Sequence, residues 1–560
     1  MAVPDRWFRQ AVIYCLDVDT YQDSDGDGIG DLPGLIDRLD YLAWLGVTCI
    51  WLNPIHPSPN RDDGYDITDF YAVHPVLGTL GDFVELIHQA NNRGIRVIID
   101  LVVNHTSDEH PWFQSARREP NSPYRDWYVW SKEQPTDLRQ GMVFPGYQDT
   151  TWSFDEEAGE WYYHRFYDFQ PDLNMSNPRV RQEIEKIIGV WLELGVAGFR
   201  LDAAPFIIEL TVPDDPAPRK DFSWLNDFRD QLAWRRGDAV ILAEANVEPE
   251  ELVEYFADGH RLPMLFNFIL NQRVFLALAR HEVGPILQAL AETPAVPDTC
   301  QWATFLRNHD EVDLGRLVGH EHDEVFAAFG PDPDMQLYGR GIRRRLAPML
   351  GNDRRRIEMA YALQFTLPGT PVIRYGDEIG MGEDLTLRER DAIRTPMQWS
   401  SAPHGGFSTA RRKRDLRRPV ITGGEFGYET VNVQDQQRDP GSLLGWFQRA
   451  LLILRECPEF GLASGTYIDT GQRSVLALVS DAPSGAMLAV TNLAEQPFTV
   501  DLGPHPAQEG DPTEVFGNSD YRPVGTDLRG IDIGPYGYRW IRLRRTLGAR
   551  AGSAVQHRRR

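Results

Sequence analysis

Cysteine is scarce in this chain, with four residues, Cys15, Cys49, Cys300 and Cys457, scattered over 560 positions. No two of them form a CxxC pair, and Cys15 and Cys49 stand within apolar runs. A cysteine in such a run behaves as a small buried hydrophobe. We therefore expect these two as free, buried thiols.

Long apolar runs are absent as well. No stretch approaches the roughly 18 consecutive apolar residues that a membrane-spanning helix needs. The first residues, MAVPDRWFRQ, lack the apolar segment of a secretory signal. The sequence therefore predicts neither secretion nor a membrane partner, and a cytoplasmic location is expected.

Positive charge is in deficit, because 57 Lys and Arg stand against 82 Asp and Glu, giving a formal net charge of -25. Nucleic acids and anionic membranes are bound by basic surfaces. Neither is therefore expected as a partner. The balance fits a protein that acts on a neutral molecule, although charge by itself names no substrate.

Apolar residues, in contrast, make up 42% of the chain and aromatic residues 11%, which is enough to fill a large core. The length predicts about two to four domains. Eight short runs rich in Val, Ile and Leu recur, and most are separated by segments with helical periodicity such as residues 32–46, 80–94 and 180–195. Strands buried on both faces have this composition. The alternation predicts an α/β fold, a (β/α)8 TIM barrel, with strands in residues 11–18, 47–52, 95–103, 196–203, 239–245, 264–270, 300–309 and 370–376.

Two stretches interrupt the barrel pattern. Residues 105–178 follow the third strand and are too long for a βα loop, so they predict an inserted subdomain, domain B. Beyond residue 465 the helical periodicity ends and strands separated by Gly, Pro and Asp predict a C-terminal all-β sandwich domain. The predicted parts are residues 1–104 with 179–465 for the barrel, 105–178 for domain B, 466–547 for the C-terminal domain, and 548–560 as a disordered tail.

Charged and polar residues gather where these strands end, which is the active-site face of a TIM barrel. They are Asp100, Asn104 and His105 after the third strand, Arg200 and Asp202 on the fourth, Glu244 on the fifth, and Asn308, His309 and Asp310 on the seventh. One acid at a strand end is more often a loop cap than a catalyst. A converging set, without a Ser-His or Cys-His pair, favours catalysis by carboxylates.

Two carboxylates facing one pocket suit glycoside hydrolysis or glycosyl transfer, with one acting as nucleophile and the other as proton donor. Asp202 and Glu244 stand on neighbouring strands, which lie about 4.8 Å apart. That spacing agrees with the roughly 5 Å of a retaining enzyme. Arg200 points to the same side as Asp202 and can keep it ionised, whereas Glu244 needs a raised pKa to hold its proton.

Five motifs resemble signature regions of the α-amylase superfamily, glycoside hydrolase family 13: DLVVNH (100–105), QPDLN (170–174), GFRLDA (198–203), AEAN (243–246) and FLRNHD (305–310). The resemblance implies that Asp202 is the nucleophile and Glu244 the acid/base. Asp310 would bind the sugar hydroxyls and distort the ring, helped by the residues His105, Arg200 and His309.

Two further motifs, RDDGYD (61–66) and RTPMQW (394–399), are similar to the α-glucosidase-like branch of that family. They imply an exo-acting pocket closed by Asp62 and Arg394, with Tyr65 stacking on the ring and Phe166 lining it. Stretches such as YGDEIGMGED (375–384) are most like the members that interconvert maltose and trehalose, so these two sugars are the expected small-molecule partners. Asn246 and Glu311 complete the implied substrate-binding set.

The chain departs from that group on the acceptor side. NHDEVDLG (308–315) has Glu311, but Gly315 stands where a second Glu is typical, and the segment after Asp202 lacks the usual Glu-Gly-Thr loop. A hydrolytic α-glucosidase with transglycosylation, or another acceptor, therefore stays open. An inactive binding subunit is the remote alternative, because such proteins usually lose a catalytic acid and here all three are present. The sequence has no GxGxxG after a strand, so no organic cofactor is expected.

The stretch DSDGDGIGD (23–31) resembles half of an EF-hand, but Gly34 occupies the position of the bidentate Glu and no second hand follows. The family resemblance implies a structural calcium in this loop. The implied ligands are Asp23, Asp25, Asp27, Asp31 and the carbonyl of Ile29, and a second calcium is implied at Asn104, Asp172 and Glu209. A turn without an ion, and a homo-oligomer, are alternatives that the sequence leaves open.

Overall fold

The computed structural model describes residues 6–215 and 218–545, so the tail predicted at 548–560 lies outside the described residues. At its centre eight parallel strands close into a barrel in the order β1-β16-β12-β11-β10-β7-β3-β2. The strands are β1 (Ile13–Leu16), β2 (Cys49–Leu52), β3 (Arg96–Leu101), β7 (Gly198–Leu201), β10 (Val240–Ala243), β11 (Met264–Phe266), β12 (Gln301–Phe305) and β16 (Thr370–Arg374).

Each barrel strand lies within one of the eight predicted runs, which confirms the predicted barrel. Alternate residues face opposite sides: Ile13, Cys15 and Trp51 join a cluster in the barrel interior, whereas Tyr14 and Ile50 join the larger core against the helices. Both faces are therefore buried, which is why the strands have no polar alternation. Cys15 and Cys49 are free and buried, as predicted.

The helix predicted at residues 32–46 divides into α1 (Leu32–Asp37) and α2 (Leu39–Leu45). Arg38 between them leaves the helical region with φ -101° and ψ 1°, and Gly46 ends α2 at φ 104°, a conformation that favours glycine. The helices predicted at 80–94 and 180–195 are α3 (Leu80–Asn92) and α5 (Pro178–Glu193). The other long helices of the barrel part are α7 (Ser223–Arg235), α8 (Pro249–Phe256), α9 (Phe268–Arg280), α10 (Gly284–Glu292), α11 (His320–Phe329), α13 (Arg354–Thr366) and α15 (Leu443–Arg455).

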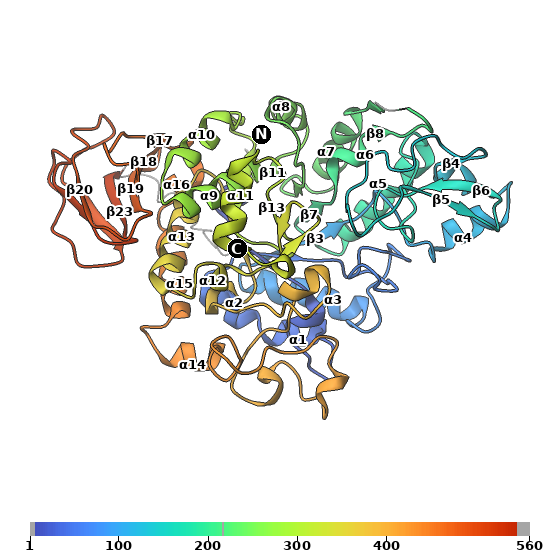
Figure 1. Ribbon diagram of the computed structural model, residues 1–560, viewed down its shortest axis with the longest axis horizontal. Coiled ribbons are helices and arrows are strands. Elements are labelled where there is room, and N and C mark those ends of the chain that lie inside the picture. Colours follow the sequence, from blue (N-terminus) through green and yellow to red (C-terminus); the bar gives the residue numbers. More distant parts are fainter. Residues whose placement is uncertain (1–5, 216–217, 546–560) are drawn as a thin grey trace, which may run out of the picture.

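The insertion between β3 and β7 contains α4 (Pro111–Arg118) and a three-stranded sheet in the order β4-β6-β5, at the right of Figure 1. Its strands are β4 (Trp130–Ser131), β5 (Trp152–Asp155) and β6 (Glu160–Tyr163). An isolated bridge between His105 and Asp172 brings the two ends of the insertion together beside the barrel. Domain B therefore starts and finishes at the end of β3, next to the predicted site.

Short elements in two βα loops also lie at the carboxyl ends of the barrel strands. After β7 come α6 (Ala204–Ile207), β8 (Glu209–Leu210) and β9 (Arg219–Lys220). After β12 come β13 (Val312–Asp313), β14 (Gln336–Leu337) and β15 (Gly341–Ile342), which pair in the order β13-β15-β14. These loops contribute to the walls of the site described below.

The C-terminal part is all-β, as the sequence predicted, and lies at the left of Figure 1. A five-stranded sheet, β17-β18-β19-β23-β21, and a two-stranded sheet, β20-β22, share one apolar core. Their strands are β17 (Thr466–Tyr467), β18 (Val475–Ala482), β19 (Gly485–Asn492), β20 (Phe498–Val500), β21 (Thr513–Gly517), β22 (Ile531–Ile533) and β23 (Tyr538–Arg545). The exact limits of the three parts stay predictions. Within the described residues, no helix has the length and apolar content to cross a bilayer.

Candidate active site

Two acidic residues follow neighbouring barrel strands. Leu201, the last residue of β7, pairs with Ala243, the last residue of β10, so Asp202 and Glu244 are the next residues on adjacent strands. Arg200 Nη1 donates to Asp202 Oδ1 at 2.6 Å, and Arg200 Nη2 donates to Glu244 Oε2. One guanidinium therefore holds both carboxylates on the same side of the barrel mouth.

Asp100 of β3 fixes this guanidinium from below. It accepts hydrogen bonds from Trp51 Nε1 at 2.9 Å and from the Tyr65 hydroxyl at 2.8 Å, and it lies 3.5 Å from Arg200 Nη1. Tyr65 also contacts His309 Nε2 at 2.7 Å, and the two rings stack. Because Asp100 and Arg200 are both about 1% exposed, this support is rigid and dry.

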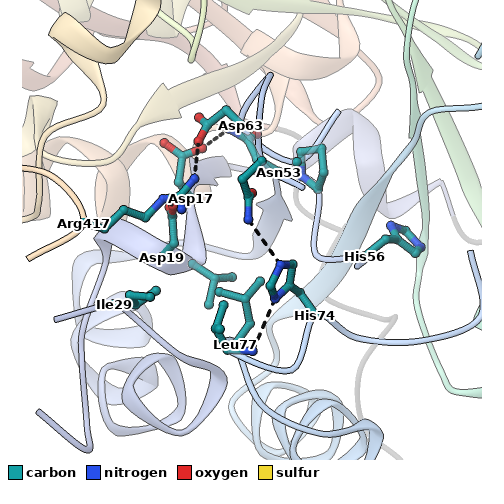
Figure 2. Close-up of a pocket in the computed structure, with 14 residues that line it drawn as sticks. Asp17, Asp19, Ile29, Asn53, His56, Asp63, His74, Leu77 and Arg417 are labelled. Atoms are coloured by element: carbon teal, nitrogen blue, oxygen red, sulfur yellow. Dashed lines mark hydrogen bonds and ion pairs between the residues drawn. The ribbon is translucent and has the colours of Figure 1, made fainter. Parts of the chain in front are cut away.

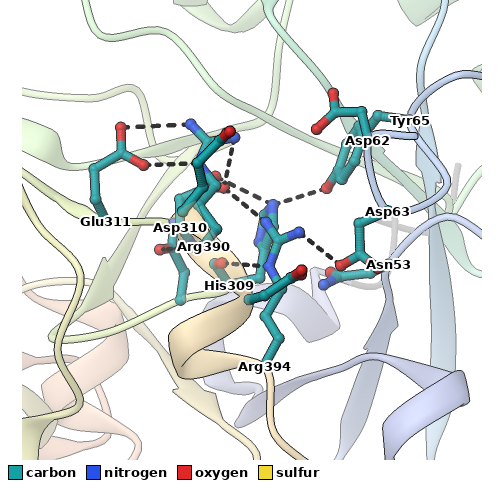
Figure 3. Close-up of polar contacts among 12 residues, drawn as sticks. Asn53, Asp62, Asp63, Tyr65, His309, Asp310, Glu311, Arg390 and Arg394 are labelled. Carbon is teal, nitrogen blue, oxygen red and sulfur yellow. Dashed lines mark hydrogen bonds and ion pairs between the residues drawn. The ribbon is translucent and has the colours of Figure 1, made fainter. Parts of the chain in front are cut away.

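Asp310 stands opposite, held by two arginines (Figure 3). Arg390 Nη1 and Arg394 Nη2 each approach Asp310 Oδ1 at 3.1 Å, and His309 Nε2 lies 3.1 Å from the other oxygen. Burial opposes ionisation of Asp310, but the charges of Arg390 and Arg394 outweigh it and keep its pKa below the usual range. Asp310 is therefore a fixed negative charge that can accept hydrogen bonds from a ligand.

The two paired acids differ in the state that their surroundings favour. Burial raises the pKa of Glu244 to about 8, with the negative charges of Asp202 and Asp310 adding to the effect and Arg200 opposing it. Glu244 therefore keeps a proton at neutral pH. Burial also raises the pKa of Asp202, against the direct bond from Arg200. Burial thus raises the pKa of both acids, and the value of about 8 at Glu244 suits the member of the pair that holds a proton.

A cavity of about 460 Å³ opens above these carboxylates. Its volume is in the range of small-molecule sites. The predicted residues that line it are Asp62, Tyr65, His105, Phe166, Asp202, Glu244, Asn246, His309, Asp310 and Glu311. Arg200 lies beneath the cavity floor, and Arg394 lies behind Asp310. The structure thus brings the predicted catalytic and binding residues to one place.

Beside the pocket, next to Asp62, lies a pair that the sequence did not identify. Arg394 Nη1 binds Asp63 Oδ2 at 2.6 Å, whereas Asp62 accepts from Gln170 Nε2 at 2.8 Å. Figure 3 shows Arg394 directed at Asp63, with the carboxylate of Asp62 turned the other way. Burial raises the pKa of Asp62 to about 7. Asp62 therefore lines the cavity, and Asp63 is the partner of Arg394.

Further arginines stand behind Asp63. Arg418 contacts Asp63, and Arg417 binds Asp19 at 2.5 Å. Beside them is a water-sized cavity of about 30 Å³, where Figure 2 shows Asp19, Asp63 and Arg417 together with His74. An ionic network therefore lies beside the active-site pocket, behind Asp62.

Arg390 is a second residue that the sequence reasoning missed. Its Nε donates to Glu311 Oε2 at 2.8 Å, and its guanidinium lies 5.2 Å from the ring of Phe144 in domain B and 5.4 Å from Tyr338. Arg390 therefore joins domain B to the loop after β12, across the pocket. Its position four residues before the predicted Arg394 could have drawn attention to Arg390. Nothing in the local sequence, however, predicts that it contacts Glu311, Phe144 and Tyr338.

The first loop gathers the acids that were predicted to bind a metal. Carboxylate oxygens of Asp23, Asp25 and Asp27 lie within 4.8 Å of one another. Calcium binds oxygen at 2.3–2.6 Å, so ligands on opposite sides of one ion are separated by about twice that distance, and the three residues fit. Asp31 has other partners, because it caps α1 through Gly34 N at 2.6 Å and accepts from Ser24 N at 2.9 Å.

The second predicted metal site has a different occupant. Arg165 Nη2 forms an ion pair with Glu209 Oε2 at 2.5 Å, and Arg165 N donates to Asp172 Oδ1 at 2.9 Å. Asn104 is buried on the same side, where its carbonyl accepts from Leu173 N. Since a guanidinium already neutralises Glu209, this set does not fit a second divalent ion.

Comparison with known proteins identifies families and relatives that this chain resembles. Residues 15–328 and 343–459 match the model of the alpha amylase catalytic domain, and residues 466–540 match the maltogenic amylase C-terminal domain. The chain is 42% identical over 546 residues to the "Trehalose synthase/amylase TreS" of Mycobacterium tuberculosis, covering 96% of this chain and 90% of the relative. It is 43% identical to the "Trehalose synthase" of Thermus thermophilus, covering 96% of this chain and 56% of that protein. Among solved structures, the alpha-amylase from H. orenii matches with a TM-score of 0.77 at 29% identity, covering 95% of this chain and 99% of that one.

Proposed function

This chain belongs to the α-amylase family, glycoside hydrolase family 13, and from that premise we propose that it interconverts maltose and trehalose by intramolecular glucosyl transfer. The observation that carries the proposal is the shared guanidinium of Arg200, which holds Asp202 and Glu244 together on adjacent strands. Relatives named trehalose synthase, 40–43% identical over most of the chain, support the choice of sugars.

In the first half of the reaction, a carboxylate oxygen of Asp202 attacks the anomeric carbon of the glucosyl unit while the bond from that carbon to the bridging oxygen breaks. Glu244 gives its proton to the departing oxygen, which leaves as the hydroxyl of free glucose. The pKa of about 8 at Glu244 is suited to this role, because the acid is protonated at neutral pH. A glucosyl ester on Asp202 and a free glucose result.

In the second half, Glu244 is a carboxylate and acts as a base. It takes the proton from the anomeric hydroxyl of the released glucose, whose oxygen attacks the anomeric carbon as the bond to Asp202 breaks. Two inversions at the same carbon give overall retention, and the product is the α,α-1,1 linkage of trehalose. The glucose has to turn over in the pocket between the two steps without leaving.

The remaining lining residues hold the sugar. Asp310, ionised between Arg390 and Arg394, accepts hydrogen bonds from hydroxyls of the bound glucosyl ring. His309 and Tyr65 stand on the same side. Because these groups are fixed by bonds below the cavity, they are placed before substrate arrives, which favours the transition state at little reorganisation cost.

Hydrolysis is the second candidate outcome from the same intermediate. The side chain of Glu244 is 30% exposed through the cavity, so water can reach the base that activates the acceptor. Attack by water in place of glucose would make the enzyme an exo-acting α-glucosidase with transglycosylation. The balance between the two products depends on how completely the pocket excludes water.

A structural calcium at Asp23, Asp25 and Asp27 is part of the proposal, with the Ile29 carbonyl as a further ligand. The convergence of three carboxylate oxygens supports it. Such an ion would neutralise the loop and stabilise the connection between β1 and α1, and no catalytic step involves it. A cytoplasmic location and self-association stay predictions.

Incubation of the purified protein with maltose, followed by chromatography that resolves trehalose from glucose, tests the proposal. Trehalose is expected to form from maltose, and maltose from trehalose, with glucose as a side product. Glucose alone from both sugars would replace the isomerase by the hydrolase. Conversion that persists in the Asp202→Asn variant would refute the mechanism itself.

A further inference from the structure

A second cavity, of about 420 Å³, lies at the end of the barrel opposite the active site. Among its lining residues, Thr48 precedes β2, Arg96 begins β3 and Gly369 precedes β16, so the amino ends of barrel strands form one side of it. Active sites of this fold lie at the carboxyl ends. The other side belongs to the 3-10 helix η1 (Trp7–Gln10), the end of α15 and the short helix α16 (Glu459–Leu462). This space is here called the basal cavity.

The charged side chains of the basal cavity are all positive. Three arginines, Arg9, Arg96 and Arg455, line it, and none of its described lining residues is an Asp or a Glu. The active-site pocket and the small cavity beside Asp63 both contain several carboxylates instead. The basal cavity is thus opposite in sign to the chain, whose formal net charge is -25. A recess lined by charges of one sign concentrates ions of the other sign, so the basal cavity attracts anions.

Arg9 has hydrogen-bond partners but no direct counter-ion. Its Nη1 donates to the carbonyl of Asp298 at 2.9 Å, and its Nη2 donates to the carbonyl of Leu462 at 2.9 Å. Its Nε is buried without a partner, and no carboxylate of the described residues forms an ion pair with it. Burial lowers the pKa of Arg9, against the attraction of Asp298. The two carbonyls therefore hold the guanidinium beside the basal cavity and leave its charge unpaired.

Arg455 and Arg96 are the other two cations of the basal cavity. Arg455 is the exposed last residue of α15, and no carboxylate among the described residues pairs with it. Arg96 is held by Asp238, which lies 2.6 Å from its Nη1, and its guanidinium lies 4.8 Å from the ring of Trp7. Since Arg96 already has an acid, a ligand with negative charge is expected to lie between Arg9 and Arg455.

Apolar side chains form much of the remaining wall. Phe365 and Leu454 are buried, whereas Trp7 and Pro458 are partly exposed. The volume of the basal cavity is in the range of small-molecule sites. A phosphate monoester is close to doubly charged at neutral pH and pairs well with guanidinium groups, so it matches two arginines that lack ion pairs. The apolar wall leaves room for an organic part beside the phosphate.

We propose that the basal cavity binds a phosphate group, either as inorganic phosphate or as a small phosphate monoester, between Arg9 and Arg455. These residues belong to η1 and to α15, so the bound anion joins both ends of the barrel part. The adjoining α16 also contacts the C-terminal sheet, because Glu459 accepts from Arg542 Nη1 of β23 at 3.4 Å. The anion therefore stabilises the junction between the barrel and the C-terminal part. The proposal does not depend on which sugar the enzyme converts.

Calorimetric titration and thermal melting test the site with glycerol 3-phosphate and inorganic phosphate, with glycerol as the neutral control. The protein is treated with chelator and kept at constant ionic strength, so that phosphate cannot act by removing calcium from the first loop. Arg455→Gln and Arg9→Gln each remove one charge and keep a polar side chain. Arg438→Gln is the matched control, because Arg438 is the exposed last residue of α14 (Val433–Arg438) and does not line the basal cavity.

We expect glycerol 3-phosphate to bind with a dissociation constant of about 1 mM or less. Arg455→Gln and Arg9→Gln should each weaken this binding by about tenfold, the equivalent of one lost charge-assisted hydrogen bond. Arg438→Gln should bind as the wild type does. At saturation the melting midpoint of the wild type should rise by a few degrees, and glycerol at the same concentration should leave it unchanged.

The two phosphate probes separate the possible sources of the anion. Tighter binding of glycerol 3-phosphate would assign the site to a monoester, and equal or tighter binding of inorganic phosphate would assign it to the free ion. Failure of both probes to bind would overturn the proposal, as would binding that Arg455→Gln leaves unchanged or that Arg438→Gln weakens equally. Arg455 is exposed, so Arg455→Gln decides the matter even if the melting curve shows that Arg9→Gln does not fold.

Discussion

Two regions of the molecule gather carboxylates in the same manner but neutralise them differently. At the barrel mouth, Asp100, Asp202 and Glu244 share the guanidinium of Arg200. In the first loop, oxygens of the three aspartates at 23, 25 and 27 lie within 4.8 Å of one another, and no ion pair reaches them among the residues that the structure describes. Among the described residues, one cluster has its counter-charge and the other has none.

Backbone amides donate most of the hydrogen bonds to the aspartates of the first loop, and Ser408 Oγ donates one more to Asp23 Oδ2 at 2.5 Å. Asp23 accepts from Gly26 N at 2.7 Å and from Gly28 N at 2.8 Å, and Asp27 accepts from Ile29 N at 2.8 Å. These bonds shape the loop but provide only partial positive charge. The difference teaches where an external cation is needed: the mouth must stay free for a neutral sugar and carries its own arginines, while the loop is built for an ion.

The largest effect should come from the nucleophile. Asp202→Asn keeps the shape of the side chain and removes the charge that attacks the anomeric carbon, so turnover of maltose should fall by at least about 10⁴-fold. Asp25→Asn, the same change in the first loop, should leave turnover at saturating calcium within about twofold. Equal losses in the two variants would contradict the division between the regions.

The second-largest effect should come from removal of Arg200, the guanidinium that the three carboxylates share. Arg200→Ala leaves the buried Asp100 and Asp202 without their partner, and breaking a buried pair typically costs about 3–5 kcal/mol of stability. Without Arg200 the pKa of Asp202 should rise further, so the acidic limb of the kcat/KM profile should move to higher pH while overall activity falls by about 10²-fold or more. Unchanged melting and an unchanged acidic limb would show that Arg200 is not the counter-charge.

The decline of kcat/KM at high pH should reflect the deprotonation of Glu244. The acid must be protonated to donate, and its pKa is about 8, so kcat/KM for maltose should decline above about pH 8, approaching tenfold per pH unit. A decline beginning near the ordinary glutamate range, below pH 6, would assign the proton to another group. Glu244→Gln should abolish the dependence together with most of the activity.

The smallest effect should be that of calcium on stability. Millimolar calcium should raise the melting midpoint by a few degrees over a chelator-treated sample, since a ligand at 100 times its dissociation constant adds about 2.7 kcal/mol. Asp25→Asn combined with Asp27→Asn should abolish the shift, and Asp202→Asn should retain it. A midpoint that chelator leaves unchanged would refute a stabilising ion in this loop.

The sequence predicted the barrel and the placement of its acids because both depend on local signals. An apolar run that ends in a charged residue marks the end of a buried strand. Asp202 and Glu244 were predicted on their strands and lie one residue beyond the ends of β7 and β10. The strands are shorter than the runs, because residues such as Val102 and Val103 continue the apolar pattern into buried loops. The division of residues 32–46 at Arg38 was missed, since no Pro or Gly marks it.

The partners of the ionic network could not be predicted in the same way. Arg394 meets Asp63 across a separation of 331 residues, and Arg390 meets Glu311 across 79. Periodicity and motif spacing contain no information on such pairs, and the resemblance named Asp62, the neighbour of the actual partner. Arg165 is a similar case, because it occupies the place where a second ion was expected.

The ion pair between Asp63 and Arg394 also has a consequence for the order in which the chain is synthesised and folded. A ribosome adds about 5–20 residues per second, so 331 residues separate the appearance of the two partners by roughly 17 to 66 seconds. During that interval the nascent chain carries Asp63 without any of its three arginines, Arg394, Arg417 and Arg418. The ionic network beside the sugar-binding pocket can therefore form only near the end of barrel synthesis, which makes it a late landmark in the biogenesis of this enzyme.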